Sequence, residues 1–153
     1  MHPMLTGGDE PRSVAADVGL TILRLGIGLM MAFGHGLAKV PPAAGFVDAV
    51  AGLGFPLPAV FAWAAGLSEL VGGLLIAAGL FTRPASLFLA VTMAVAAFMR
   101  HGGDPLFSRE GPSKEMAVLY LVAAAAFMLA GSGRFGIDAL LRRRPETSPA
   151  MDR

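Results

Sequence analysis

Four ionisable side chains lie inside stretches of the sequence that are otherwise apolar. Arg24, His35 and Lys39 belong to the run LRLGIGLMMAFGHGLAKV, and Glu69 belongs to the run GLSELVGGLL. Because an ionisable group is unfavourable in hydrocarbon, such residues usually face the interior of a helix bundle and serve in binding or proton transfer. These residues are therefore our candidates for chemistry, with His35 and Glu69 as the catalytic groups that would move a proton.

Read as a single α-helix, the first run places its basic groups on one face. Arg24, Gly28, Met31 and His35 follow the spacing i, i+4, i+7 and i+11, and Lys39 follows one turn later. Glycines on both sides of His35 make the helix thin there, which allows a neighbouring helix to approach closely. The pattern predicts a polar stripe that faces another helix.

Glu69 needs a cation if it lies near the middle of a membrane helix. An unpaired carboxylate in that position must either take up a proton or find a positive charge. We expect Arg24 to supply the charge, because a guanidinium binds a carboxylate through two parallel hydrogen bonds. The alternative is that this pair only fixes the helix register, while His35 and Lys39 extend to the outer headgroups.

The composition is that of an integral membrane protein with one domain. Of the 153 residues, 55% are hydrophobic and 15% are charged, whereas a soluble domain carries about 25% charged residues. The net charge of +1, without a long basic stretch, argues against nucleic acid as a partner. The absence of cysteine excludes disulfides, a cysteine nucleophile and cysteine-ligated iron–sulfur clusters.

Four apolar segments predict an all-α fold, an integral membrane four-helix bundle. They cover residues 18–39, 57–81, 84–99 and 116–130. A spanning helix needs about 20 apolar residues, with a lower limit of about 17. The last two segments are therefore short, and three-span alternatives stay open. We divide the chain into an N-terminal cytoplasmic segment over 1–17, the transmembrane domain over 18–141 and a basic tail over 142–153.

Lysine and arginine in short loops indicate how the bundle is oriented. With four spans both termini share a side, which receives Arg12, Arg83, Arg134 and the arginine cluster at 142–144. The other side receives Lys39, Arg100, Arg109 and Lys114, so the arginine cluster decides the orientation. We therefore expect a multi-pass membrane protein with both termini in the cytoplasm. Segment 43–53 has apolar residues at helical spacing and is expected to form a short helix in the interface.

Two similar strings, AFGHG and AFMRHG, end the first and the third apolar segments. They could mark a repeated helical hairpin, although short matches arise easily in apolar sequence.

Several polar residues could gather at the outer end of the bundle. Arg100, His101, Asp104, Lys114 and Glu115 could line a pocket with His35 and Lys39, or they could form a solvated loop. No metal site is expected, because a transition metal usually takes three or four protein ligands and the suitable residues are few and dispersed. We interpret the methionines as apolar filler rather than as copper ligands.

Four stretches of the chain form an ordered set of motifs: LRLGIGLMMAFGHGLAKV, GFPLP, SELVGGLLIAAGLFTRPAS and KEMAVLYLVAAAAFMLAGSGRFGIDALL. Together they resemble the DoxX family of small bacterial and archaeal membrane proteins, from about Leu20 to Leu141. The most specific part is the combination of an HGxxK helix end, an ExxGG core and a GRxxxD exit. The resemblance implies a four-helix integral membrane protein, which we expect in the bacterial inner membrane.

The resemblance also implies a connection to electron transfer. The family is named for a subunit related to thiosulfate:quinone oxidoreductase, which passes electrons from thiosulfate to membrane quinone. Other members are associated with membrane oxidoreductase assemblies that handle sulfur compounds and oxidative stress. Many members have no established activity, so the family indicates the fold better than the reaction.

We expect the membrane subunit of a quinone-linked oxidoreductase, with quinone as its cofactor or substrate. The quinone would lie between the first two helices, in a groove made thin by Gly28 and Gly73. His35 or Glu69 would exchange protons with it, and Arg24 would balance the charge of Glu69.

The expected partners are the lipid bilayer, a soluble or membrane redox subunit, and optionally a second copy of the chain. Lys39 would attract an anionic sulfur donor at the membrane surface. Two other functions stay open. One is a scaffold that anchors a soluble partner through the tail, and the other is a small transporter with Glu69 as its proton carrier.

Overall fold

The computed structural model describes residues 13–142, and these residues form helices and turns without a strand. In chain order the α-helices are α1 (Val14–Met31), α2 (Ala44–Gly52), α3 (Pro58–Ala78), α4 (Thr82–Val95), α5 (Glu115–Ala130) and α6 (Ile137–Arg142). A π-helical turn, Ala32–Gly36, and a 3-10 turn, Leu37–Lys39, continue α1, and a second π-helical turn, Ala96–Arg100, continues α4. The prediction of an all-α fold is confirmed.

Three of these helical segments are long and apolar enough to cross a membrane. They are Val14–Lys39, Pro58–Ala78 and Thr82–Arg100, with 26, 21 and 19 residues. The segment Glu115–Ala130 is apolar but has 16 residues, fewer than the lower limit of about 17. Four spanning helices therefore stay a prediction, of which three are supported by length and composition.

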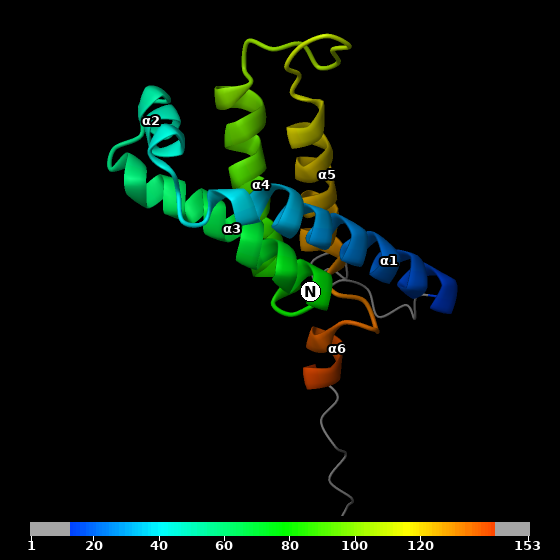
Figure 1. Cartoon of the computed structure of the whole chain (residues 1–153). Coiled ribbons are helices and arrows are strands. Elements are labelled where there is room, and N and C mark those ends of the chain that lie inside the picture. The colour runs from blue at the N-terminus through cyan, green and yellow to red at the C-terminus, as the bar shows by residue number, and fades with distance from the viewer. Residues whose placement is uncertain (1–12, 143–153) are drawn as a thin grey trace, which may run out of the picture.

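The helices form two pairs that cross each other. In Figure 1, α4 and α5 stand side by side, and α1 and α3 run obliquely across them. Helix α2 packs on α3, which confirms the helix predicted for segment 43–53. Helix α6 lies below the crossing, and we call this side the α6 end. The opposite side, with the loop over residues 101–114, is the loop end.

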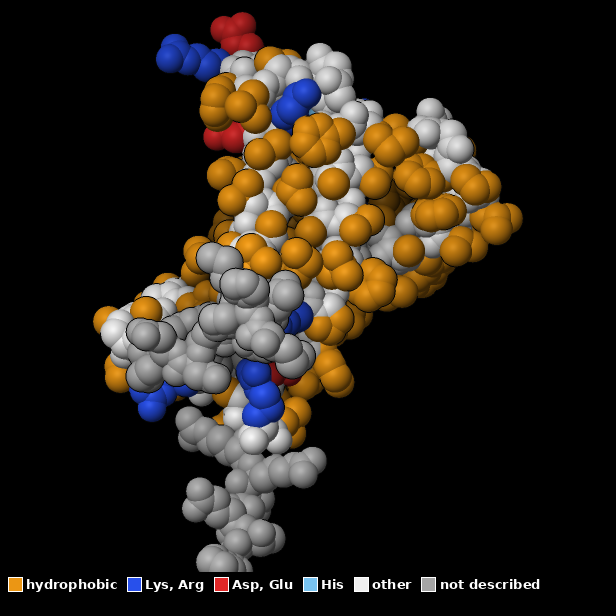
Figure 2. Space-filling model, turned by 180° about the vertical axis from the view of Figure 1, so that it is seen from behind, with side chains coloured by type: hydrophobic (Ala, Val, Ile, Leu, Met, Phe, Trp, Pro, Cys, Tyr) orange, Lys and Arg blue, Asp and Glu red, His pale blue; other side chains and the backbone are white. Residues whose placement is uncertain are grey.

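The surface between the two ends is largely apolar. Figure 2 shows hydrophobic side chains over the middle of the molecule, with charged side chains toward its two ends. Ile22, Phe88 and Leu129 are 66%, 65% and 74% exposed. So large an apolar surface is unusual for a protein in water and is what a lipid environment requires, which agrees with the predicted membrane location.

Glycines bring α1 and α3 into direct backbone contact. A Cβ atom placed on Gly73 would lie 2.7 Å from the carbonyl oxygen of Gly28, closer than real Cβ atoms come to other atoms. Gly36 is held equally closely against the backbone of Leu70. Within a membrane the hydrophobic effect does not drive helices together, so close packing of this kind supplies much of the attraction between them.

Each of the two similar strings coincides wholly or partly with a π-helical turn. AFGHG is the turn Ala32–Gly36, and AFMRHG overlaps the turn Ala96–Arg100. A π-turn carries one more residue than an α-turn, so the side chains that follow are rotated by about 100° from their α-helical positions. The two segments share this local structure, while an internal repeat stays a prediction.

Candidate functional site

Glu69 forms its ion pair with Lys39. The Nζ atom of Lys39 lies 2.6 Å from Oε1 and 2.7 Å from Oε2 of Glu69. Glu69 is 2% exposed and the side chain of Lys39 is 32% exposed. A carboxylate with so little access to water requires such a partner, and the same ammonium lies 5.5 Å from the ring centroid of Phe46 on α2.

The prediction that Arg24 pairs with Glu69 is therefore wrong. The π-turn and the 3-10 turn after Met31 change the direction in which Lys39 points, so its place does not follow from α-helical spacing. Gly66 then lets the backbone of Lys39 touch α3, because a Cβ atom on Gly66 would lie 2.8 Å from the carbonyl oxygen of Lys39.

Arg24 instead binds the last turn of α3. Its Nη1 atom donates hydrogen bonds to the carbonyl oxygens of Ile76, at 3.0 Å, and Ala77, at 2.5 Å. The last carbonyls of a helix have no partner within the helix, and a cation near them also interacts favourably with the helix dipole. Arg24 is 2% exposed. It stabilises the α6 end of the bundle and lies away from the pair formed by Lys39 and Glu69.

A small space inside the bundle brings together three of the polar candidates, His35, Glu69 and His101. We call it the inner cavity, and its volume is about 120 Å³. It is lined by Met31, His35, Glu69, Met93, Ala96, His101, Met116, Ala117 and Tyr120. A buried water needs about 10–15 Å³ of such volume, so the cavity can hold several waters but is small for a drug-sized ligand.

A second, larger space adjoins the inner cavity on the lipid-facing side. This lateral groove lies between α1 with its π-turn and α5, and its volume is about 570 Å³. It is lined by Leu29, Met30, Phe33, Gly34, His35, Met116 and Tyr120. His35, Met116 and Tyr120 line both spaces, so they form the wall between the lipid-facing groove and the polar interior.

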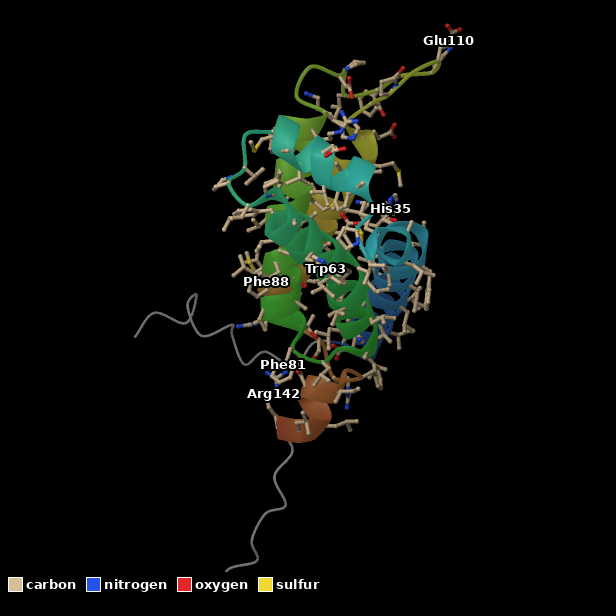
Figure 3. The ribbon with its side chains drawn as sticks, turned by 60° about the vertical axis from the view of Figure 1, so that its left-hand side comes forward. His35, Trp63, Phe81, Phe88, Glu110 and Arg142 are labelled. Carbon is tan, nitrogen blue, oxygen red and sulfur yellow. The ribbon has the colours of Figure 1, made fainter. Side chains whose placement is uncertain are left out.

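The imidazole of His35 meets the phenol ring of Tyr120 edge to face. The ring centroids are 5.4 Å apart and the ring planes are 77° apart. Tyr120 is buried on α5, whereas His35 is half-buried. Figure 3 shows His35 between Glu110 at the loop end and Arg142 at the α6 end. Two groups that can donate or accept a proton thus meet within the apolar part of the protein.

His101 extends this polar set toward the loop end. Its Nδ1 atom lies 2.7 Å from Oδ2 of Asp104, and both residues are half-buried. His101 and His35 line the same inner cavity. The sequence had suggested that these two residues could share a pocket at the outer end. Lys114 instead donates to the carbonyl oxygen of Gly102. The outer cluster is therefore only partly assembled.

The structure does not support a quinone site between α1 and α3. Gly28 and Gly73 do meet there, but the two backbones are so close that no ring fits between them. Gly28, Gly73 and Arg24 line neither the inner cavity nor the lateral groove. The open space beside His35 lies instead between α1 and α5.

Tyr120 is the polar wall residue that sequence reasoning missed. It is the one tyrosine of the chain and lies in an apolar segment, where a tyrosine is usually a packing or interface residue. The signal for His101 was the AFMRHG string, which places a histidine at the end of a span as AFGHG does. Within residues 13–142, no three His, Asp or Glu side chains come together as metal ligands.

A further apolar pocket lies between α2, α3 and α4. Its volume is about 280 Å³, and we call it the α2 pocket. It is lined by Val50, Leu53, Phe55, Phe61, Ala64, Ala65, Ser68, Phe88, Val91, Thr92, Val95, Ala96 and Arg100. The hydroxyl oxygens of Ser68 and Thr92 are 2.6 Å apart and bind each other, so Arg100 is the polar side chain of this pocket that is not engaged within its lining.

Comparison with known proteins places the chain in a family. A family model described as DoxX matches residues 19–102. The chain is 40% identical over 76 residues to an uncharacterised protein of Haemophilus influenzae, a match that covers 48% of this chain and 57% of that protein. It is 32% identical over 128 residues to the inner membrane protein YphA of Escherichia coli, covering 81% of this chain and 91% of YphA. No solved structure matches the chain. The chain belongs to the DoxX family and is a multi-pass membrane protein.

Proposed function

We propose that this protein is the membrane subunit of a quinone-linked oxidoreductase and that the quinone ring binds in the lateral groove against His35 and Tyr120. One observation carries the proposal: these two side chains separate a groove open to the bilayer from an inner cavity that holds Glu69. The groove has a volume of about 570 Å³ and is shallow and open on one side, so a quinone ring bound there would lie with one face against the protein.

The arrangement suits the proton chemistry of a quinone. Reduction of a quinone to a quinol adds two electrons and two protons, and the protons go to the two ring oxygens. His35 and Tyr120 can donate hydrogen bonds to a ring oxygen in the groove, and His35 can then be reprotonated from the inner cavity. The cavity is lined by His101, whose imidazole contacts Asp104 near the loop end, and this chain of polar groups would give protons a route that avoids the lipid.

Glu69 and Lys39 act together in this proposal. Lys39 neutralises the buried carboxylate and fixes its position beside the cavity. The role considered for Lys39 from sequence, the attraction of an anionic sulfur donor, is less suitable because its ammonium is engaged by both oxygens of Glu69. We assign it to the support of Glu69.

The electrons come from a second subunit. The chain has no cysteine, so it cannot supply a thiol pair or a cysteine-ligated cluster of its own. In this proposal the partner oxidises a reduced sulfur compound and passes two electrons to the quinone, as the family resemblance implies. The scaffold alternative depends on the tail over 142–153, of which the structure describes Arg142 only.

Two exposed phenylalanines provide a matched test of the binding site. Phe33 lines the lateral groove and is 59% exposed, and Phe88 lines the α2 pocket and is 65% exposed. We expect Phe33→Ala to weaken binding of a short-chain quinone to the purified protein by about tenfold and Phe88→Ala to leave it unchanged, as measured by equilibrium titration in detergent. The reverse pattern would move the quinone to the α2 pocket, and no measurable quinone binding to the wild-type chain would overturn the proposed function.

A further inference from the structure

A pocket at the α6 end joins two arginines to an apolar rim. This α6 pocket has a volume of about 310 Å³. It is lined by Phe81, Thr82, Arg83, Pro84, Gly131, Ser132, Asp138, Leu141 and Arg142. Arg83 comes from the first turn of α4 and Arg142 from the last residue of α6, so two separate elements supply the positive charge. Figure 3 shows Phe81 and Arg142 together at this end of the molecule.

Asp138 holds the pocket in shape. Its carboxylate accepts hydrogen bonds from the backbone N–H groups of Phe81, at 2.8 Å, and Thr82, at 3.0 Å, and from the Thr82 hydroxyl, at 2.9 Å. Its own N–H donates to the carbonyl oxygen of Gly79 at 2.8 Å. Helix α6 is therefore fixed to the start of α4 by Asp138, without help from either arginine.

The two guanidinium groups keep most of their donors for another partner. Arg142 donates from Nε to the carbonyl oxygen of Asp138 at 3.1 Å, and Arg83 makes a long contact of 3.4 Å with the carbonyl oxygen of Leu129. Among residues 13–142, neither arginine forms an ion pair with a carboxylate. Paired guanidinium groups with free donors are suited to a phosphate, whose oxygens accept two hydrogen bonds from one fork.

The rim of the pocket identifies the rest of the ligand as apolar. Phe81 and Leu141 line it and are 62% and 69% exposed. Apolar side chains exposed beside arginines are typical of a segment that lies in the membrane interface. A free anion would gain nothing from this rim, whereas a lipid would place its glycerol and acyl chains there.

We propose that the α6 pocket binds the phosphate headgroup of an anionic phospholipid through Arg83 and Arg142. Two guanidinium groups outweigh the single carboxylate of Asp138, whose oxygens are already engaged by α4. Basic pockets between membrane helices are a known means of selecting such headgroups. The site is separate from the lateral groove, and its occupancy does not depend on the proposed function.

The test compares variants with the same loss of charge at opposite ends of the molecule. The full chain is delipidated in neutral detergent, phosphatidylglycerol is added, and bound lipid is measured by native mass spectrometry. We expect Arg83→Gln/Arg142→Gln to weaken binding by about thirtyfold. The control, Arg100→Gln/Arg109→Gln, should leave binding unchanged. Phosphatidylcholine should bind weakly, and to the same extent in the wild type and in all variants.

Three results would overturn the proposal. One is equal binding by the wild type and the α6-pocket variant, and a second is an equal loss in both variants, which would mean a general charge effect. The third is binding of inorganic phosphate alone with the same dependence on the two arginines, which would make this a site for a soluble anion. If the glutamine variant unfolds, Arg83→Lys/Arg142→Lys keeps the charge but removes the fork, and it should still bind more weakly than the wild type.

Discussion

The pair formed by Lys39 and Glu69 is the central polar interaction of the bundle. It joins the end of the first membrane segment to the middle of α3 at 2.6 Å, with the carboxylate 2% exposed. The types and spacing of the residues identified both members as important, but the π-turn between Met31 and Lys39 determined which cation reached Glu69. A pattern based on 3.6 residues per turn cannot show that extra residue, because the turn forms through packing against α3.

Removal of one member of this pair should be more harmful than removal of both. Lys39→Met leaves the Glu69 carboxylate buried without a partner. It should lower the free energy of unfolding by about 3 kcal/mol, the lower end of the usual cost, because Lys39 is partly exposed. Lys39→Met/Glu69→Gln should recover most of this loss. Unfolding in mixed micelles measures both variants, and a single variant as stable as the wild type would refute the pairing.

At the scale of elements, two glycines in one π-turn provide a test of how α1 meets α3. A Cβ atom on Gly36 would collide with the backbone of Leu70, whereas a Cβ atom on Gly34 would meet nothing within 4 Å. We expect Gly36→Ala to destabilise the protein by about 1–3 kcal/mol and Gly34→Ala to be neutral or slightly stabilising. Thermal unfolding in detergent compares them, and equal effects would show that α1 and α3 are not in close contact.

Asp138 should make the attachment of α6 sensitive to acid. Burial acts to raise its pKa, but the N–H groups of Thr82 and Phe81, the Thr82 hydroxyl and the charge of Arg142 outweigh burial and lower the pKa below the ordinary value of 3.8. Because the folded-state pKa is lowered, this contribution to stability is complete above about pH 4 and disappears as the pH falls through the folded-state pKa.

The corresponding measurement is limited proteolysis after α6 as a function of pH, with an acid-active protease. Cleavage in the wild type should rise only below about pH 4. Asp138→Asn should be cleaved to an equal extent across that range, since the amide does not titrate. Wild-type cleavage that is independent of pH, or an asparagine variant with the same acid response, would contradict the role of Asp138.

Much of the element pattern was predictable, and most of the contacts between elements were not. Hydropathy identified the three long spans and the helix over 43–53, because burial in lipid selects long apolar segments directly. The start of α1 was placed at residue 18, four residues late, because Ser13 accepts a hydrogen bond from the N–H of Ala16 and begins the helix earlier. The groove predicted at Gly28 and Gly73 is closed, since glycine pairs that permit close contact also remove the space for a ligand.

For the whole molecule, the distribution of arginines predicts the orientation in the membrane. Arg83, Arg134 and Arg142 belong to the α6 end, and Arg100, Arg109 and Lys114 belong to the loop end; Figure 3 shows Glu110 at the loop end and Arg142 at the α6 end. Two more arginines follow Arg142 in the sequence, so the balance of positive charge favours the α6 end. We expect the α6 end to face the cytoplasm. Because the chain has no cysteine, Glu110→Cys and Leu140→Cys each introduce a single reactive thiol while all arginines remain.

An impermeant maleimide applied to spheroplasts should label Glu110→Cys at once and Leu140→Cys only after lysis. Labelling of Leu140→Cys alone in intact spheroplasts would invert the orientation. Labelling of both from outside would mean that an odd number of helices crosses the membrane, and it would exclude α5 as a span.

The central claim is that quinone binds between α1 and α5, against His35 and Tyr120. Photochemical crosslinking of an azidoquinone to the membrane-embedded protein, followed by mass spectrometry of the labelled peptides, tests it most directly. We predict adducts on residues 29–36 and 116–120, and their loss when unlabelled quinone is present in excess. Adducts confined to the α2 pocket, or labelling that excess quinone does not reduce, would contradict the account.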